Sequence, residues 1–272
     1  MTCPHCAATT TVELTKRTQL GYRTFRCSIC QRQFNERTGT PFNYLEFPTD
    51  VILLVVLWRV RYKLSLRDLA EMCLERGFAF THEAVRVGAR FAPLVADKLR
   101  AKRKGQVGRA WHVDETYIRV GGVWKYLYRA IDREGNLVDS MLSEHRDMPA
   151  AKRFFTAALA VAEQAPEQVT TDGHDSYPRA IRETLGEAVR HRCNPYLNNR
   201  IEQDHRGIKQ RYYPMRGFGN FDAASRFCRA FDEQRQYFRM RTSMRQRVPP
   251  LSEHRRVYCA RWKALMGELM AT

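Results

Sequence analysis

Three acidic residues in this 272-residue chain occupy positions from which they could hold metal ions together. Asp114 lies in a stretch rich in β-branched and aromatic residues, Asp172 directly follows a shorter stretch of that kind, and Glu202 lies early in a polar helical stretch. Strands with a helix across their ends can gather three carboxylates around two Mg²⁺ ions, roughly 4 Å apart, which activate a hydroxyl for attack on a phosphodiester. Taken singly, each acid could be an ordinary solvated or turn residue.

Two further polar residues share the helix face of Glu202. Asn198 lies one turn before Glu202 and Lys209 lies two turns after it, so all three project from one side of a helix. A lysine in that position could bind a phosphate.

Each of the three acids has an acidic neighbour, and backbone geometry predicts which of the two is used. Asp114 and Glu115 are adjacent in a strand and face opposite sides, so we expect only one of them to reach the metals. Glu202 and Asp204 are two residues apart on a helix, about 200° around its axis. Asp175 is expected to cap the helix that it precedes.

Four cysteines near the N-terminus have the spacing of a zinc site. Cys3-x-x-Cys6 and Cys27-x-x-Cys30 are separated by 20 residues, as in two hairpin pairs that complete one tetrahedron. Because the segment is too short for a sizeable core, one structural Zn²⁺ is favoured over unrelated buried thiols or a redox pair. The remaining cysteines are expected to be packed thiols: Cys73, Cys193, Cys228 and Cys259.

The stretch from residue 48 to residue 99 has apolar residues at helical spacing. Ser65 and Thr81 are placed as N-caps of two short helices joined by a turn that contains Gly77, which is helix-turn-helix spacing. A plain packing unit of three helices is the alternative. In the first case the second helix would present these residues to base edges in DNA: His82, Glu83, Arg86 and Arg90.

The elements that must position the acids follow from the periodicity of apolar residues. Alternation predicts three antiparallel strands joined by two hairpin turns, at 111–120, 123–131 and 137–142. Short strands are predicted at 168–171 and around 189, and helices at 148–164, 177–185, about 199–212 and 222–241. This order predicts an α/β fold, a mixed sheet with flanking helices.

The same punctuation divides the chain into four expected segments. They are a zinc ribbon over 1–45, a helix-turn-helix DNA-binding domain over 46–105, a catalytic domain over 106–220, and a C-terminal helix and basic tail over 221–272.

The charge distribution indicates a polyanionic partner. The chain carries 46 Lys and Arg against 29 Asp and Glu, a formal charge of +17, and the excess lies at the two ends, with a slightly acidic block between 111 and 197. Lys and Arg that neutralise phosphates supply most non-specific affinity for DNA. The longest apolar run, 51–58, is far shorter than the roughly 20 residues of a membrane span. The first residues do not read as a secretory signal either, so we expect a cytoplasmic protein.

Several motifs in a fixed order make the chain similar to a known family. After the cysteine pairs and the two short helices come Trp111-x-x-Asp114-Glu115-Thr116-Tyr117, the stretch 126–132, Thr171-Asp172 and Asn198-Asn199-x-x-Glu202-x-Asp204-His205. With these motifs the chain resembles the DDE transposases of bacterial insertion sequences, and most closely the insertion sequence six family. The resemblance implies an RNase H-like catalytic domain with Asp114, Asp172 and Glu202 as its carboxylates and Lys209 as its basic residue.

The function expected is DNA transposition. The protein would bind double-stranded DNA at the ends of a mobile element, hydrolyse a phosphodiester with two Mg²⁺ ions and join the freed 3′-hydroxyl to target DNA. Pairing two ends requires two protomers or more, so we expect a homodimer or a larger assembly on DNA, at the bacterial nucleoid. The alternatives are a zinc-ribbon and helix-turn-helix regulator without catalysis, and a recombinase with a Tyr nucleophile or a paired-His metal site, for which the sequence gives little support.

Overall fold

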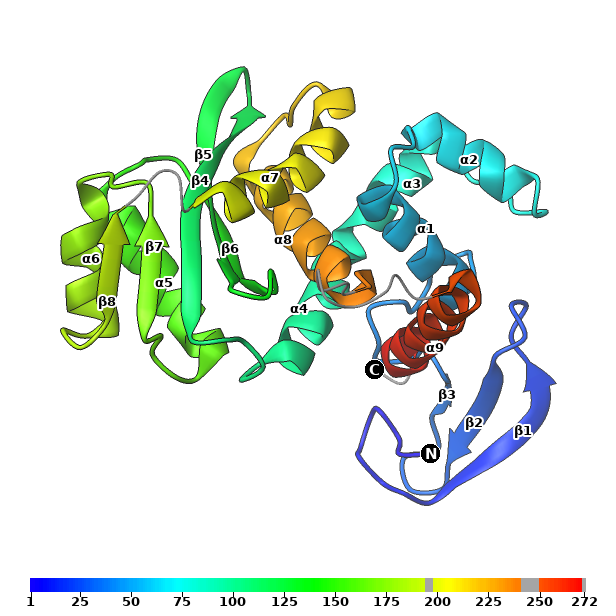
Figure 1. Ribbon diagram of the computed structural model, residues 1–272. Helices are drawn as coiled ribbons and strands as arrows, with labels where there is room; N and C mark the ends of the chain where they lie inside the picture. Colours follow the sequence, from blue (N-terminus) through cyan, green and yellow to red (C-terminus); the bar gives the residue numbers. More distant parts are fainter. Residues whose placement is uncertain (194–197, 241–249, 271–272) are drawn as a thin grey trace. The chain divides into compact units, whose positions relative to one another are not determined.

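The computed structural model describes residues 1–193, 198–240 and 250–270 (Figure 1). The chain divides into two compact units, one formed by residues 1–54 with 264–272 and the other by residues 55–263. No helix among the described residues combines the length and the hydropathy needed to cross a membrane.

The first unit contains a three-stranded antiparallel sheet. Its strands, in the order β1-β2-β3, are β1 (Thr11–Arg17), β2 (Arg23–Cys27) and β3 (Gln33–Asn35). Phe25 lies opposite Phe34 with ring centroids 5.5 Å apart, and both pack against Cys3 and Cys27. A core of this size provides little hydrophobic stabilisation on its own.

Helices follow one another from residue 49 to residue 103. They are α1 (Thr49–Arg61), which begins in the first unit, then α2 (Leu66–Leu74), α3 (His82–Gly88), a 3₁₀ turn (Ala89–Phe91) and α4 (Ala92–Arg103). Both expected caps are confirmed, because Ser65 Oγ accepts from Asp68 N and Thr81 Oγ1 accepts from Ala84 N, each at 3.1 Å. Gly77 has a φ of +81° in the turn between α2 and α3.

A five-stranded mixed sheet organises the second unit. Its order is β6-β5-β4-β7-β8, with β4 (Ala110–Val120), β5 (Val123–Asp132), β6 (Leu137–Ser143), β7 (Gln168–Thr171) and β8 (Arg190–Cys193). β4, β5 and β6 are antiparallel neighbours, whereas β7 runs parallel to β4 and β8 runs parallel to β7. The expected α/β class, the mixed sheet and its consecutive hairpins are confirmed.

Helices cover both faces of this sheet (Figure 1). α5 (Met148–Ala162) and α6 (Ser176–Leu185) pack on the face that carries Trp111, Val113 and Tyr128. α7 (Asn199–Tyr212), a 3₁₀ turn (Tyr213–Met215) and α8 (Phe221–Phe238) follow. α7 and α8 lie on the opposite face, where Arg129 pairs with an acid from each helix.

The C-terminal region is more ordered than the basic tail expected from the sequence. Residues Leu251–Met270 form a further helix, α9, in which Leu265, Met266 and Leu269 are buried. The apolar residues at positions 265, 266 and 269 form a stripe of helical spacing among the basic residues, and such a stripe stabilises a helix when it is covered.

Candidate active site

The register of two parallel strands brings Asp114 and Asp172 together. β4 pairs with β7 through His112 opposite Thr170, so two residues further along both chains Asp114 meets Asp172, just past the end of β7. One carboxylate oxygen each from Asp114, Glu115 and Asp172 lies within 4.8 Å of the others. The expectation that only one of the adjacent residues Asp114 and Glu115 could reach this place is therefore wrong, because their carboxylates approach each other although their backbone positions face opposite sides of the sheet.

The electrostatics of this group favour a cation. Burial, with Glu115 and Asp172 nearby, raises the pKa of Asp114 from 3.8 to about 7. Arg146, in the loop between β6 and α5, donates to Glu115 Oε2 at 3.0 Å and to Asp172 Oδ2 at 2.9 Å. Although burial opposes its charge, these two carboxylates raise the pKa of Arg146 above its ordinary value. No local sequence signal marks Arg146, and the sequence analysis missed it.

Carboxylate oxygens are the ligands that Mg²⁺ prefers, so the donor set fits a hard divalent cation. Three carboxylates in a partly dehydrated place repel one another, and a bound cation would remove that repulsion. The residues of this group therefore match the metal that the sequence predicts.

α7 adjoins the acidic group through His205. His205 Nδ1 lies 3.7 Å from Asp114 Oδ2, and Asn198 Nδ2, just before α7, donates to Val113 O at 3.0 Å. Glu202 is exposed on the first turn of α7 and is not one of the three carboxylates within 4.8 Å. It precedes His205 by three residues and so shares one side of the helix with it.

His205 is a buried neutral imidazole. Burial, followed by the positive charges of Arg129 and Lys209, lowers its pKa to about 2. Lys209 follows His205 by four residues on α7, and its position on the side of the helix that carries Glu202 stays a prediction.

Asp204 and Asp175, the acidic neighbours of Glu202 and Asp172, lie outside the acidic group. Asp204 is buried, and its oxygens pair with Arg129 at 2.7 Å and with Arg235 at 2.6 Å. Its carboxylate therefore joins α7 to β5 and α8. Asp175 has the N-cap position of α6, but its side chain makes no capping hydrogen bond, so the predicted cap is present in position alone.

The four N-terminal cysteines converge. All four Sγ atoms lie within 4.8 Å of one another, with Cys3 and Cys30 at 3.7 Å and Cys6 and Cys27 at 3.6 Å. The backbone N–H of His5 donates to Cys3 and that of Ile29 donates to Cys27, each at 3.4 Å. Backbone donors, that of Cys30 first, lower the pKa of Cys27 to about 6, which favours a thiolate. This geometry fits a tetrahedral metal site. Among the four isolated cysteines, Cys73 and Cys228 are buried as expected, whereas Cys193 and Cys259 are exposed.

α3 presents the polar residues named from the sequence. Val85 is buried, whereas the side chains of His82, Glu83 and Arg86 are at least half exposed. Glu83 lies between the other two, 3.5 Å from His82 and 2.6 Å from Arg86. Arg90 lies over the ring of Phe91, 4.9 Å from its centroid.

The chain is similar to known transposases. Residues 108–241 match the DDE domain of the IS240-type transposase family model. Over 176 residues the chain is 39% identical to the transposase for insertion sequence-like element IS431mec of Staphylococcus aureus, and 38% identical to the transposase for insertion sequence element IS257 in transposon Tn4003 of the same species. Each alignment covers 62% of this chain and 77% of the relative.

Among solved structures, a simian T-cell lymphotropic virus intasome in complex with PP2A regulatory subunit B56 gamma aligns at 16% identity and a TM-score of 0.39, over 54% of this chain and 59% of that one. The identity to the two transposases, over most of their length, and the DDE domain that contains Asp114, Asp172 and Glu202 decide the family. The chain is a DNA transposase of the DDE type and belongs to the insertion sequence six family.

Proposed function

We propose that this transposase hydrolyses a phosphodiester at the ends of its element and joins the freed 3′-hydroxyl to target DNA, with two Mg²⁺ ions held by Asp114, Asp172 and Glu202. The approach of Asp114 to Asp172 on parallel strands, with the raised pKa of Asp114, carries this proposal. The two ions, when bound, lower the pKa of the attacking hydroxyl and stabilise the leaving oxygen.

The residues of the chain have distinct tasks in this proposal. Asp114 and Asp172 hold the metals from the sheet, and Glu202 supplies a carboxylate from the first turn of α7. The contact of His205 with Asp114 supports this, because it places the same side of α7 beside the sheet acids. Lys209 holds a phosphate next to the cleaved bond, and the protein positions the reacting oxygens in line. In the metal-free protein Arg146 neutralises part of the charge of Glu115 and Asp172.

The flanking elements hold the DNA. The cysteine cluster binds one structural Zn²⁺ as a zinc ribbon, supported by its converging Sγ atoms. The pair α2 and α3 acts as a helix-turn-helix whose second helix reads the element ends with His82, Glu83, Arg86 and Arg90. The exposure of the first three at the N-terminal half of α3 supports this. In this proposal the zinc ribbon ends at residue 45, the helix-turn-helix domain at residue 105 and the catalytic domain at residue 220.

Two copies or more assemble on the paired ends, because transposition joins both ends of an element. The working place is the cytoplasm, at the nucleoid, where the DNA substrate lies.

A strand-transfer assay tests the proposal. Purified protein is incubated with labelled DNA of the element's own ends, a target plasmid and Mg²⁺, and Asp114→Asn serves as the inactive control. We expect cleaved ends and joined products from the wild-type protein alone. Binding of the ends without cleavage in any divalent metal would instead favour the DNA-binding regulator.

A further inference from the structure

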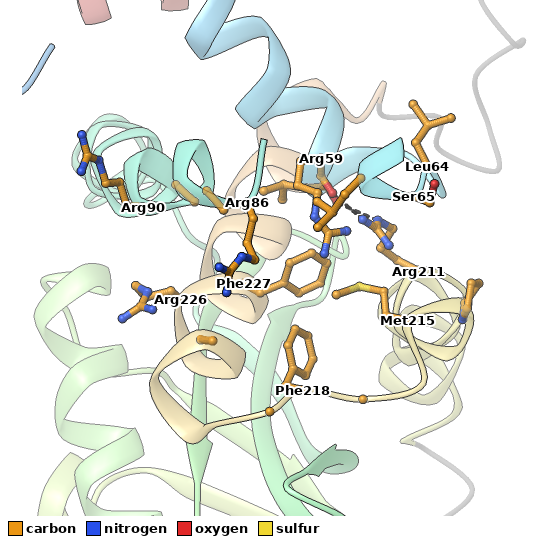
Figure 2. Close-up of a pocket in the computed structure, with 18 of the residues that line it drawn as sticks. Arg59, Leu64, Ser65, Arg86, Arg90, Arg211, Met215, Phe218, Arg226 and Phe227 are labelled. Atoms are coloured by element: carbon orange, nitrogen blue, oxygen red, sulfur yellow. Dashed lines mark hydrogen bonds between the residues drawn. The ribbon is translucent and has the colours of Figure 1, made fainter. Parts of the chain in front are cut away.

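A basic groove lies within the second unit, apart from the acidic group. It is a hollow of about 920 Å³ between the end of α1, the α2–α3 pair and the connection from α7 to α8 (Figure 2). The one acid among its lining residues, Asp68, already accepts from Ser65 N in the cap of α2. Six basic side chains line the hollow: Arg59, Lys63, Arg86, Arg90, Arg211 and Arg226.

Two of these basic side chains face each other without a counter-charge. Arg211 is 2% exposed, and its guanidinium donates to the backbone oxygens of Val60 and Arg59. Burial, and then the charge of Arg59, lowers the pKa of Arg211 to about 10. In the described part of the chain, no carboxylate lies within ion-pair distance of Arg59, Arg211 or Arg226. An anion in the groove would relieve this repulsion, and the phosphates of DNA are the anions that a transposase meets.

The floor of the groove is aromatic and rigid. Figure 2 shows Met215, Phe218 and Phe227 gathered below Arg59 and Arg211, with Arg226 to one side. The backbone of Phe218 is held on both sides, because its N–H donates to Arg119 O at 2.9 Å and its carbonyl accepts from Gly121 N at 2.8 Å. Its ring stacks on Tyr212, with centroids 6.1 Å apart.

The residue before Phe218 must be glycine. Gly217 has a φ of +112°, and a Cβ there would lie 2.9 Å from Arg119 O. The chain therefore presents a half-buried aromatic side chain at a fixed position in a groove whose arginines at 59, 211 and 226 have no carboxylate partner among the described residues.

The combination of arginines with an aromatic floor indicates that the groove contacts bases as well as phosphates. Basic residues alone would suffice for the backbone of a duplex, whose bases are stacked inside and cannot reach an aromatic floor. Grooves that join basic residues to aromatic side chains are typical of sites for unpaired strands, in which bases stack on the rings. A volume of this size is also in the range of clefts that enclose a small organic group.

We propose that the groove formed by Arg59, Arg211, Arg226, Met215 and Phe218 binds an unpaired segment of the DNA strand, with a base against Phe218 and phosphates at Arg59 and Arg226. The inference rests on the proposed function, because it assumes that the protein handles DNA ends. It adds a second contact to the end DNA, on residues outside the metal site.

The first test compares two duplexes of the element end, one fully paired and one with a single unpaired 2-aminopurine near the end. We expect the fluorescence of the 2-aminopurine to fall when the protein binds, because stacking quenches it. Phe218→Leu, which keeps an apolar side chain, should lose roughly 10-fold or more in affinity for the unpaired probe and little for the paired one. Tyr213→Leu removes a neighbouring exposed aromatic outside the groove and should bind both probes as the wild-type protein does.

The second test measures affinity for the unpaired probe as a function of salt. Arg226→Gln should reduce the slope of log K against log salt by about one, because one phosphate contact is lost. Arg229→Gln, one turn further on α8 and paired with Asp97, should leave the slope unchanged.

The two tests distinguish failure of the groove hypothesis from failure of the proposed function. An unquenched probe, or equal losses on both duplexes for Phe218→Leu, would overturn the groove while the strand-transfer assay still succeeds. A wild-type protein that binds neither duplex would overturn both.

Discussion

The fold holds three carboxylates of this protein close enough to repel one another. Asp114, Glu115 and Asp172 lie within 4.8 Å, and Arg146 bridges two of them. The positive charge of Arg146 therefore lies beside these acids in the metal-free protein. At the residue scale, substitutions can identify which acids are essential and how much their mutual repulsion lowers the stability of the fold.

Amide substitutions identify the essential acids. We expect Asp114→Asn, Asp172→Asn and Glu202→Gln each to abolish Mg²⁺-dependent cleavage while end binding persists, because each removes a metal ligand. Glu115→Gln is the matched control in the same cluster and should retain measurable cleavage. If Glu115→Gln were as inactive as Asp114→Asn, the ligand on β4 would have to be reassigned.

The raised pKa of Asp114 predicts a pH-dependent stability of the metal-free protein. Its folded pKa of about 7 lies above its ordinary value of 3.8, so the folded protein binds this proton more tightly than the unfolded chain does. The contribution of Asp114 to the free energy of unfolding is therefore fully present below about pH 4 and is lost as the pH rises through 7. With chelator present, Asp114→Asn should stabilise the protein by up to about 4 kcal/mol at pH 8 and by almost nothing at pH 4.

Urea unfolding at the two pH values measures this difference. Asp175→Asn, at an exposed carboxylate three residues after Asp172, is the control and should change neither value. A gain of equal size at both pH values would contradict the electrostatic explanation.

At the scale of elements, we expect the N-terminal sheet to depend on a bound metal. Four buried residues form its core, which is little hydrophobic burial for three strands. We expect one zinc per chain by metal analysis, and chelation or Cys27→Ser should unfold residues 1–45. Cys259→Ser, at an exposed thiol far along the chain, should keep the zinc. A metal-free protein with an intact N-terminal sheet would contradict the prediction.

The second element-level prediction concerns α3. Arg86→Ala should weaken binding to the element's own ends by about 1 to 3 kcal/mol and leave binding to random DNA nearly unchanged, because a base contact is lost. Competition assays with the two DNAs measure this. Arg67→Ala on α2 removes an equal charge from an exposed site and should affect both DNAs alike and slightly. Equal losses for Arg86→Ala on both DNAs would make Arg86 a phosphate contact.

At the scale of the whole molecule, a buried ion cluster joins the sheet to the helices that carry the site. Arg129 of β5 is 1% exposed and contacts Asp204 of α7 and Asp232 of α8, each at 2.7 Å. Arg129→Met should therefore destabilise the protein by about 3 to 5 kcal/mol in urea unfolding, since two buried acids lose their shared cation. Arg119→Met on the neighbouring strand, at an exposed site, should stay within about 0.5 kcal/mol of the wild type.

The sequence by itself determined the local structure and the candidate metal-binding residues. Alternation of apolar residues predicted the strands around Asp114, helical spacing predicted the helices, and Ser65 and Thr81 predicted their caps; the structure confirms all of these. Such signals arise from backbone geometry over a few residues, so they can be read without the fold. The cysteine spacing is local in the same sense.

Only the tertiary structure decided which distant side chains meet. It placed Glu115 in the acidic group, bridged that group with Arg146, committed Asp204 to Arg129, and formed the groove between Arg211 and Phe218. The contacts of Arg146 and of Asp204 join residues that are far apart along the chain. All of these arrangements depend on strand register and helix packing, in which a shift of one residue exchanges the faces of a strand. No periodicity or motif in the sequence carries that information, because it is a property of how the elements pack.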